Sequence, residues 1–148
     1  MIRVVLILIA FLLFVLAAVA NAAGTDGASY PARVVRVLDG DTFAAVVRIW
    51  PNVQADVSVR VRGIDTPESG PRARCDSERL RAGSAKSRVI GLLPAGSEIR
   101  LTNVGQDKYA GRVVARVVLP DGRSLADVLV EEGLARPYDG GTKQGWCP

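Results

Sequence analysis

Three short segments of the sequence combine carboxylates with basic side chains in a pattern that suits phosphate chemistry. They are Asp39-Gly40-Asp41-Thr42, the stretch over residues 60–68, and Asp107-Lys108-Tyr109-Ala110-Gly111-Arg112. Carboxylate and carbonyl oxygens are the ligands that a hard cation such as Ca²⁺ prefers, and arginine binds phosphate through two parallel hydrogen bonds. The combination favours metal-assisted chemistry on a phosphate ester.

The composition narrows the choice of catalytic groups, because the chain has no histidine. Histidine is the usual general base near neutral pH and a frequent metal ligand, so zinc hydrolases and histidine-based triads are not expected. Activation of a water molecule then falls to a carboxylate, for which Glu68 is the candidate. Arg60 and Arg112 could hold a phosphate and offset the charge that develops on it during attack. The candidate cation ligands are Asp41, Asp65 and the main-chain carbonyl of Thr66.

Periodicity in the sequence predicts the elements that must position these residues. Ser124 and Asp127 match a capping box that starts a short helix. The element order is that of a five-stranded OB-type barrel, an α+β fold that is mainly β, with an amphipathic helix between strands three and four and a short C-terminal helix. A generic α+β domain is the alternative. The predicted strands cover 33–38, 42–49, 57–64, 98–104 and 112–119, and the helices cover 75–93 and 124–132.

The third predicted strand carries basic residues at alternating positions. Side chains alternate between the faces of a strand, so Arg60, Arg62 and Ile64 are expected on the face opposite the valines of 59–64. Pro67 lacks an N–H and disfavours a helical conformation in the residue before it, so it ends the strand. The carboxylates on either side of Pro67 are therefore presented together.

The longer predicted helix begins at Cys75, one of two cysteines in the chain. An even pair in an exported protein favours a disulfide between Cys75 and Cys147, which would close a loop of about 72 residues and stabilise the fold by about 4 kcal/mol on the chain-entropy model. Two free thiols are the alternative. On the helix itself, Glu78 is expected on the polar face, opposite Ala82 and Ala85.

The order and spacing of the motifs match a known protein family. Over roughly residues 33–138 the chain resembles the staphylococcal nuclease, or thermonuclease, family. The resemblance rests on Asp39-Gly40-Asp41-Thr42, on the strand that ends in Asp65-Thr66-Pro67-Glu68, on Asp107-Lys108-Tyr109 followed by Arg112, and on Gly133-Leu134-Ala135. One departure is Ala110, which adds a residue before Gly111-Arg112 and makes the reach of Arg112 depend on the loop.

The resemblance implies Ca²⁺-dependent hydrolysis of phosphodiesters in DNA or RNA, with products that end in a 3′-phosphate. It implies the following roles: Ca²⁺ ligation by Asp41, Asp65 and the Thr66 carbonyl, water activation by Glu68, and phosphate stabilisation by Arg60 and Arg112. Contacts with the nucleotide are implied for Lys108 and Tyr109, with Tyr138 as a candidate for base stacking. Asp39 would support its loop without binding the metal. We expect the protein to act as a monomer.

The N-terminus is a candidate export signal. Met1-Ile2-Arg3 precedes an uninterrupted apolar run over 4–20, and small residues at Ala20-Asn21-Ala22 give a cleavage site after Ala22. We expect a signal peptide at 1–22, a linker at 23–30 and the nuclease-like domain at 31–148, in the periplasm or outside the cell and without stable membrane association. The alternative is a retained anchor that holds the domain on the outer side of the membrane.

Charge and composition leave the partner partly open. The formal net charge of +4 at pH 7 is compatible with a polyanionic partner without demonstrating one. A non-catalytic OB-type module that binds nucleic acid or protein is the alternative to a nuclease. The glycine-rich stretch 140–145 is expected to be a surface loop, and Arg62 a charge at the barrel rim. Nothing in the sequence ranks DNA over RNA.

Overall fold

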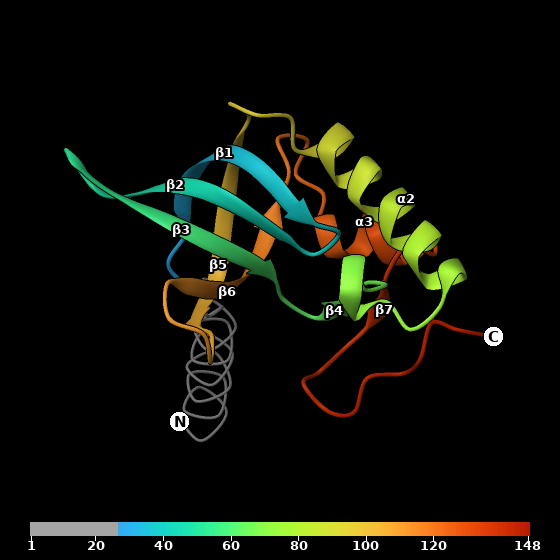
Figure 1. Cartoon of the computed structure of the whole chain (residues 1–148). Coiled ribbons are helices and arrows are strands. Elements are labelled where there is room, and N and C mark those ends of the chain that lie inside the picture. Colours follow the sequence, from blue (N-terminus) through green and yellow to red (C-terminus); the bar gives the residue numbers. More distant parts are fainter. Residues whose placement is uncertain (1–26) are drawn as a thin grey trace, which may run out of the picture.

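The computed structural model describes residues 27–148, so the expected signal peptide at 1–22 lies outside the described residues. Five strands close into a barrel in the order β1-β2-β3-β6-β5 (Figure 1). All neighbouring pairs are antiparallel except β3 and β6, which run parallel. The strands are β1 (Tyr30–Asp39), β2 (Thr42–Trp50), β3 (Val53–Val61), β5 (Glu98–Gln106) and β6 (Arg112–Val118). The mainly β fold with a closed five-stranded barrel is therefore confirmed.

The core fills the inside of this barrel and extends beneath the helices. Alternate residues of each strand point inward, as Phe43, Ala45 and Val47 do on β2. Helix α2 (Asp76–Leu92) packs against β1, and α3 (Leu125–Glu131) packs against β6 and β7. The Ser124 hydroxyl accepts the backbone N–H of Asp127 at the start of α3, which is one of the two hydrogen bonds of the predicted capping box. A short 3₁₀ helix, η1, covers Gly70–Arg72.

The strand predicted at 57–64 differs from the observed one in its extent. β3 starts at Val53 and ends at Val61, and a turn at Arg62 and Gly63 separates it from β4 (Ile64–Asp65). Gly63 has a φ of 86°, a conformation that interrupts the alternation of side chains. Ile64 is consequently 2% exposed and belongs to the core, so its predicted place on the arginine face was wrong.

β4 pairs with a second short strand, β7 (Arg136–Pro137), outside the barrel. The sequence pattern did not predict this pair. The backbone N–H of Tyr138 then donates to the carbonyl of Gly63, which extends the contact by one residue. The pairing brings the chain after α3 beside β4 (Figure 1).

Glu78 is the main correction on α2. It is 3% exposed, whereas the amphipathic pattern placed it on the polar face. Its two carboxylate oxygens accept the backbone N–H groups of Glu68 and Arg74, so the buried charge is used to hold a loop. Helical periodicity could not show this, because the partners are backbone groups outside the helix.

The C-terminal tail ends beside the start of α2, where Cys75 and Cys147 form the predicted disulfide. Their Cα atoms are 6.0 Å apart. The expected linker ends one residue early, because β1 begins at Tyr30. Within 27–148, no helix combines the length and apolar character needed to span a membrane.

Candidate active site

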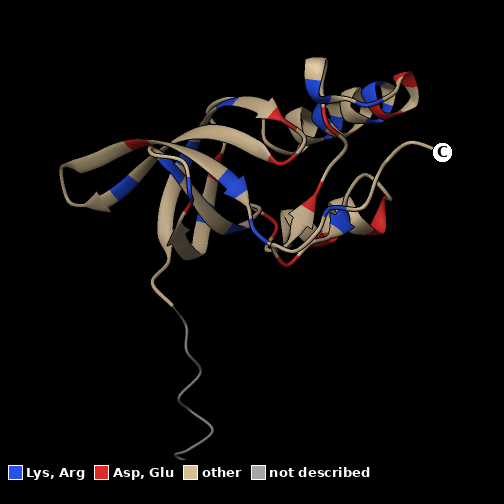
Figure 2. Cartoon of the chain, turned by 60° about the horizontal axis from the view of Figure 1, so that its bottom comes forward, with Lys and Arg blue, Asp and Glu red and all other residues tan. Residues whose placement is uncertain are grey.

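Arg60 lies between the two predicted acidic ligands at one end of the barrel. Its Nη1 is 2.5 Å from Oδ2 of Asp41, and its Nη2 is 3.9 Å from Oδ1 of Asp65. Nη2 also donates to the carbonyl of Ile64. β2 and β3 pair in a register that puts Thr42 opposite Arg60, so hairpin pairing alone brings Asp41 to the arginine. Acidic and basic segments meet at this end of the barrel (Figure 2).

The turn between β1 and β2 presents Asp41 and is pressed against its neighbours. A Cβ on Gly40 would stand 3.0 Å from Cβ of Ala85 and 3.1 Å from Oγ1 of Thr66. Position 40 therefore needs glycine for lack of space, because its backbone does not adopt a positive φ. Asp39 accepts hydrogen bonds from Ser69 and Arg72, so it ties the turn to the segment after Glu68, in keeping with a supporting role.

β4 and the segment after it carry the other predicted metal ligands and the predicted base. Asp65 and Thr66 are 5% and 3% exposed, whereas Glu68 reaches the surface with 28% of its side chain exposed. Oε1 of Glu78 accepts a hydrogen bond from the backbone nitrogen of Glu68, 3.2 Å away. Glu68 is thus a carboxylate on a fixed backbone at the edge of the groove, with Lys143 2.8 Å from its Oε1 and Arg72 3.2 Å from its Oε2. A partly exposed carboxylate in this position suits contact with a water molecule.

The loop between β5 and β6 absorbs the extra residue at Ala110. The backbone N–H of Arg112 donates to the carbonyl of Tyr109, and Gly111 takes a φ of 75°, so the surplus is contained in a tight turn. Arg112 then begins β6, where its Nε is 2.7 Å from Oδ2 of Asp107 and its guanidinium lies 4.6 Å from the centre of the Tyr109 ring. The hydrogen bond from Arg112 holds the pKa of Asp107 below its usual range.

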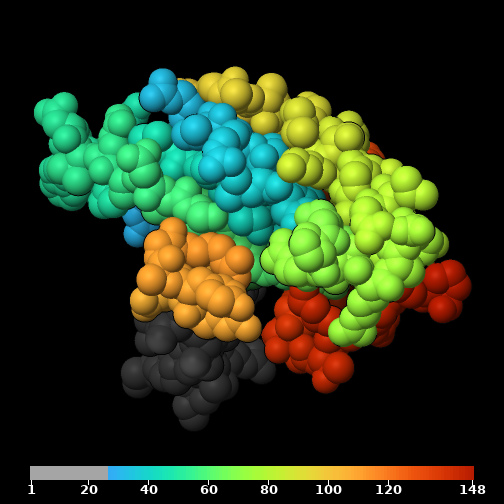
Figure 3. Space-filling view, in the orientation of Figure 1, coloured from blue at the N-terminus to red at the C-terminus, as the bar shows by residue number. Residues whose placement is uncertain are grey.

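An open groove joins these loops to the arginine and carboxylate cluster. Figure 3 shows a hollow between the β5–β6 loop, drawn orange, and the C-terminal tail, drawn red. The side chain of Tyr138 lines the groove, and its hydroxyl donates to the carbonyl of Gly141. The groove contains all five predicted phosphate and nucleotide contacts as well as Glu68: Arg60, Lys108, Tyr109, Arg112 and Tyr138.

Arg62 is not part of the reactive cluster, although it lines the same groove. Its Nε and Nη2 donate to the backbone carbonyls of Asn103 and Val114, respectively. The guanidinium also occupies the space beside Gly105, where an added Cβ would be 2.7 Å away. Arg62 therefore links β5 to β6 at the rim of the barrel, where the pairing of these two strands is irregular.

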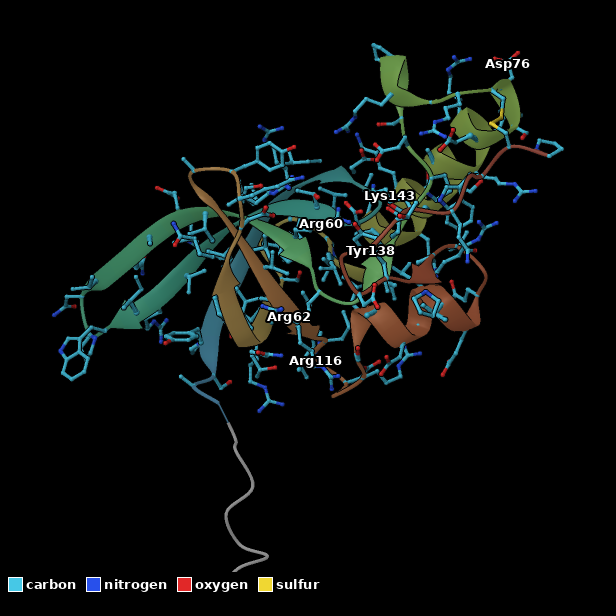
Figure 4. All side chains as sticks on the ribbon, turned by 90° about the horizontal axis from the view of Figure 1, so that it is seen from below. Arg60, Arg62, Asp76, Arg116, Tyr138 and Lys143 are labelled. Carbon is cyan, nitrogen blue, oxygen red and sulfur yellow. A yellow bond between two sulfur atoms is a disulfide. The ribbon has the colours of Figure 1, made fainter. Side chains whose placement is uncertain are left out.

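Lys143 is a residue of this site that the sequence reasoning missed. Its Nζ lies 2.6 Å from Oδ1 of Asp65 and 2.8 Å from Oε1 of Glu68, and Figure 4 shows it beside Arg60 and Tyr138. Partial burial lowers the pKa of Lys143, but its contacts with Asp65 and Glu68 outweigh this effect, and the pKa is raised overall. The stretch 140–145 is an exposed loop as expected, yet one side chain reaches inward. The sequence feature that could have pointed to Lys143 is the predicted disulfide, because it fixes the tail near α2.

Trp146 is a second missed residue. It is 6% exposed, its indole N–H donates to Oδ2 of Asp65 at 3.2 Å, and the Arg136 guanidinium lies 3.9 Å from its ring centre. Oδ1 of Asp65 is buried and receives no hydrogen bond of suitable direction. This oxygen lies 2.6 Å from the Lys143 ammonium instead, so it already faces a cation. The carboxylates of Asp41 and Asp65 both contact Arg60, and their oxygens are ligands of the kind that Ca²⁺ prefers. The residues present therefore fit the implied ion.

Comparison with known proteins identifies the family of the chain. Residues 58–145 match the family model described as staphylococcal nuclease homologue. The chain belongs to this family. An uncharacterized endonuclease of Escherichia coli is 34% identical over 72% of the chain and 60% of that relative. A protein named micrococcal nuclease from Shigella flexneri is 30% identical over 75% of the chain and 60% of that relative.

The residues matched to the staphylococcal nuclease homologue family include most of the candidate site residues. The matched region begins within β3 and includes Arg60, Glu68, Arg112 and Lys143, whereas Asp41 lies ahead of it. Asp41 enters the site through the barrel register described above. The chain spans about 60% of the length of these curated relatives.

Proposed function

We propose that the chain is a Ca²⁺-dependent nuclease that hydrolyses phosphodiester bonds in DNA or RNA and leaves 3′-phosphates. The observation that carries the proposal is the position of Arg60, which contacts Asp41 and Asp65 and lines a groove together with Glu68 and Arg112. Family membership and relatives named endonuclease and micrococcal nuclease support it.

The carboxylates divide into ligands and a base. Asp41, Asp65 and the main-chain carbonyl of Thr66 would hold Ca²⁺, which when bound supplies positive charge for the phosphate. Glu68 would accept a proton from the attacking water, because its side chain is more exposed than those of Asp41 and Asp65. Its backbone is held by Glu78, so the carboxylate is fixed in place.

The two arginines would bind the phosphate. Arg60 and Arg112 line the groove with side chains that are 17% and 24% exposed, and a substrate phosphate would replace part of their carboxylate contacts. Guanidinium groups in a partly desolvated groove stabilise the negative charge that grows on the phosphate during attack. Lys108, Tyr109 and Tyr138 would contact the flanking nucleotide.

The test is cleavage of single-stranded DNA by purified protein in Ca²⁺ or in chelator. Glu68→Gln is expected to lower the rate by about 10²–10⁴-fold and Arg60→Gln by about 10²–10³-fold. Arg48→Gln, which changes the same charge at the far end of β2, should cleave at the parent rate. A protein that binds DNA but never cleaves it would be the non-catalytic module instead.

We further propose that the protein is exported and that residues 1–22 are removed. A disulfide between Cys75 and Cys147 supports an oxidising compartment. N-terminal sequencing of protein recovered from outside the cytoplasm is expected to start at Ala23. A retained Met1 in membrane fractions would instead show an anchor.

A further inference from the structure

The ammonium group of Lys143 stands between two carboxylates of the proposed metal and catalytic site. Its nitrogen is 2.6 Å from Oδ1 of Asp65 and 2.8 Å from Oε1 of Glu68. These residues are far apart in the sequence, so tertiary structure alone makes the contact. The Lys143 side chain is 41% exposed, which leaves it a path out of the site.

The tail holds Lys143 from both sides. Ahead of it, β7 pairs with β4, and the Tyr138 backbone donates to Gly63. Behind it, the carbonyl of Gly145 accepts from Arg136, and Cys147 is bonded to Cys75. The loop between these anchors therefore keeps the ammonium near the carboxylates at a high effective concentration.

Trp146 gives the tail a second contact with Asp65. Its indole N–H donates to Oδ2 of Asp65, while Lys143 approaches Oδ1. Both oxygens of this buried carboxylate are thus engaged by the same tail. Arg60 adds a more distant contact at 3.9 Å.

A divalent cation on Asp65 would need the oxygen that Lys143 contacts. Two cations within a few ångströms repel strongly, and one carboxylate oxygen approached at 2.6 Å by an ammonium leaves little room for a metal bond. Binding of the metal then requires the ammonium to withdraw. The apparent affinity for the metal falls by the fraction of molecules in which it has withdrawn.

We propose that Lys143, carried on the disulfide-anchored tail, is an internal cation that competes with Ca²⁺ for Asp65 and so sets the Ca²⁺ affinity of the site. The inference rests on the proposed function, since it concerns the same metal site. The tail is in this sense part of the active site. Lys143 acts through the metal ligands and is a positioning residue, because nothing places it on the substrate.

The experiment is a calorimetric titration of Ca²⁺ into the protein without nucleic acid. Lys143→Gln is expected to bind Ca²⁺ about tenfold more tightly than the parent, while Lys143→Arg, which keeps the charge, should remain close to the parent. Arg48→Gln removes one positive charge at the distant hairpin and controls for net charge. Asp65→Asn should abolish the heat and so assign it to this site. Circular dichroism spectra and thermal unfolding establish that each variant is folded.

The alternatives give distinct results. If the parent and Lys143→Gln bind Ca²⁺ with the same dissociation constant, competition is refuted while the metal site of the proposed function stands. If Lys143→Gln binds Ca²⁺ equally and loses affinity for a DNA oligonucleotide, Lys143 is a phosphate contact and the inference is also wrong. If neither protein binds Ca²⁺, both the inference and the Ca²⁺ dependence of the proposed nuclease fail.

Discussion

The carboxylate of Glu78 accepts a hydrogen bond from the backbone N–H of Glu68, with oxygen and nitrogen 3.2 Å apart. A buried residue of α2 thereby fixes the backbone of the proposed general base. The second oxygen of Glu78 accepts the N–H of Arg74, so one side chain holds two points of the segment between β4 and α2.

Replacing Glu78 is expected to impair both stability and activity. Glu78→Gln presents an amide NH₂ to one of the two N–H groups, which then lacks an acceptor, at a cost of about 1–3 kcal/mol in the free energy of unfolding. Displacement of Glu68 should slow cleavage by up to about 100-fold. Urea unfolding and single-turnover cleavage measure the two effects. Glu131→Gln, on the exposed side of α3, is the control, and equal cleavage rates in both variants would contradict the role of Glu78.

Arg60 should not tolerate lysine, although the charge is kept. A guanidinium can contact Asp41 and Asp65 through different nitrogens and still bind phosphate through two hydrogen bonds, which a single ammonium nitrogen cannot do. Arg60→Lys is expected to lower the cleavage rate by about 100-fold. The same change at Arg116, an exposed residue of β6, should have little effect. Comparable rates for Arg60→Lys and the parent would show that charge alone suffices.

Gly40 should be intolerant of a methyl group for steric reasons. In Gly40→Ala the new Cβ would meet Ala85 at 3.0 Å and Thr66 at 3.1 Å, and relieving this overlap is expected to cost about 1–3 kcal/mol. Gly83→Ala is a matched control, because a Cβ there meets nothing within 4 Å and the residue lies within α2. That control should instead stabilise the protein by about 0.5–1 kcal/mol. The midpoint temperature of thermal unfolding is expected to fall in Gly40→Ala and to rise in Gly83→Ala.

The ion pair of Asp107 with Arg112 predicts a pH dependence. Since the pKa of Asp107 is lowered in the folded protein, the pair contributes stability above the ordinary carboxyl pKa. The contribution is lost as the pH falls from that value through the folded pKa, and Arg112 is then released from its partner. In Arg112→Met the pKa of Asp107 should rise, as measured by NMR of the side-chain carboxyl carbon. An unchanged pKa would mean that the hydrogen bond from Arg112 does not hold the carboxylate.

The disulfide is expected to contribute substantially to stability. Replacing both Cys75 and Cys147 by serine removes the covalent closure of a long loop, which is worth about 4 kcal/mol on the chain-entropy model. Denaturant unfolding of the double variant should show this loss, and the parent in reducing agent should show the same. A stability equal to that of the oxidised parent would mean that noncovalent contacts already hold the tail.

The sequence by itself was sufficient for the barrel and for a set of candidate site residues. Period-two alternation and the turn signals at Asp39-Gly40 identified the strands, and motif order predicted site roles for Asp41, Arg60, Asp65, Glu68 and Arg112. These candidates are readable because each lies at a strand end or in the turn that follows one, where local pattern and position in the fold coincide. The pairing of Cys75 with Cys147 was likewise predictable, since the chain has no other cysteine.

Only the tertiary structure decided what lies around those residues. Glu78 looks like a surface charge because periodicity reports one helix face and cannot show that the hydrogen-bond donors are backbone groups of another segment. Lys143 and Trp146 lie on a glycine-rich tail with no periodicity, and they reach Asp65 only because β7 pairs with β4 and the disulfide fixes the chain end. Contacts between groups so distant in sequence depend on chain closure and not on local preference, and the ammonium beside Asp65 is the consequence.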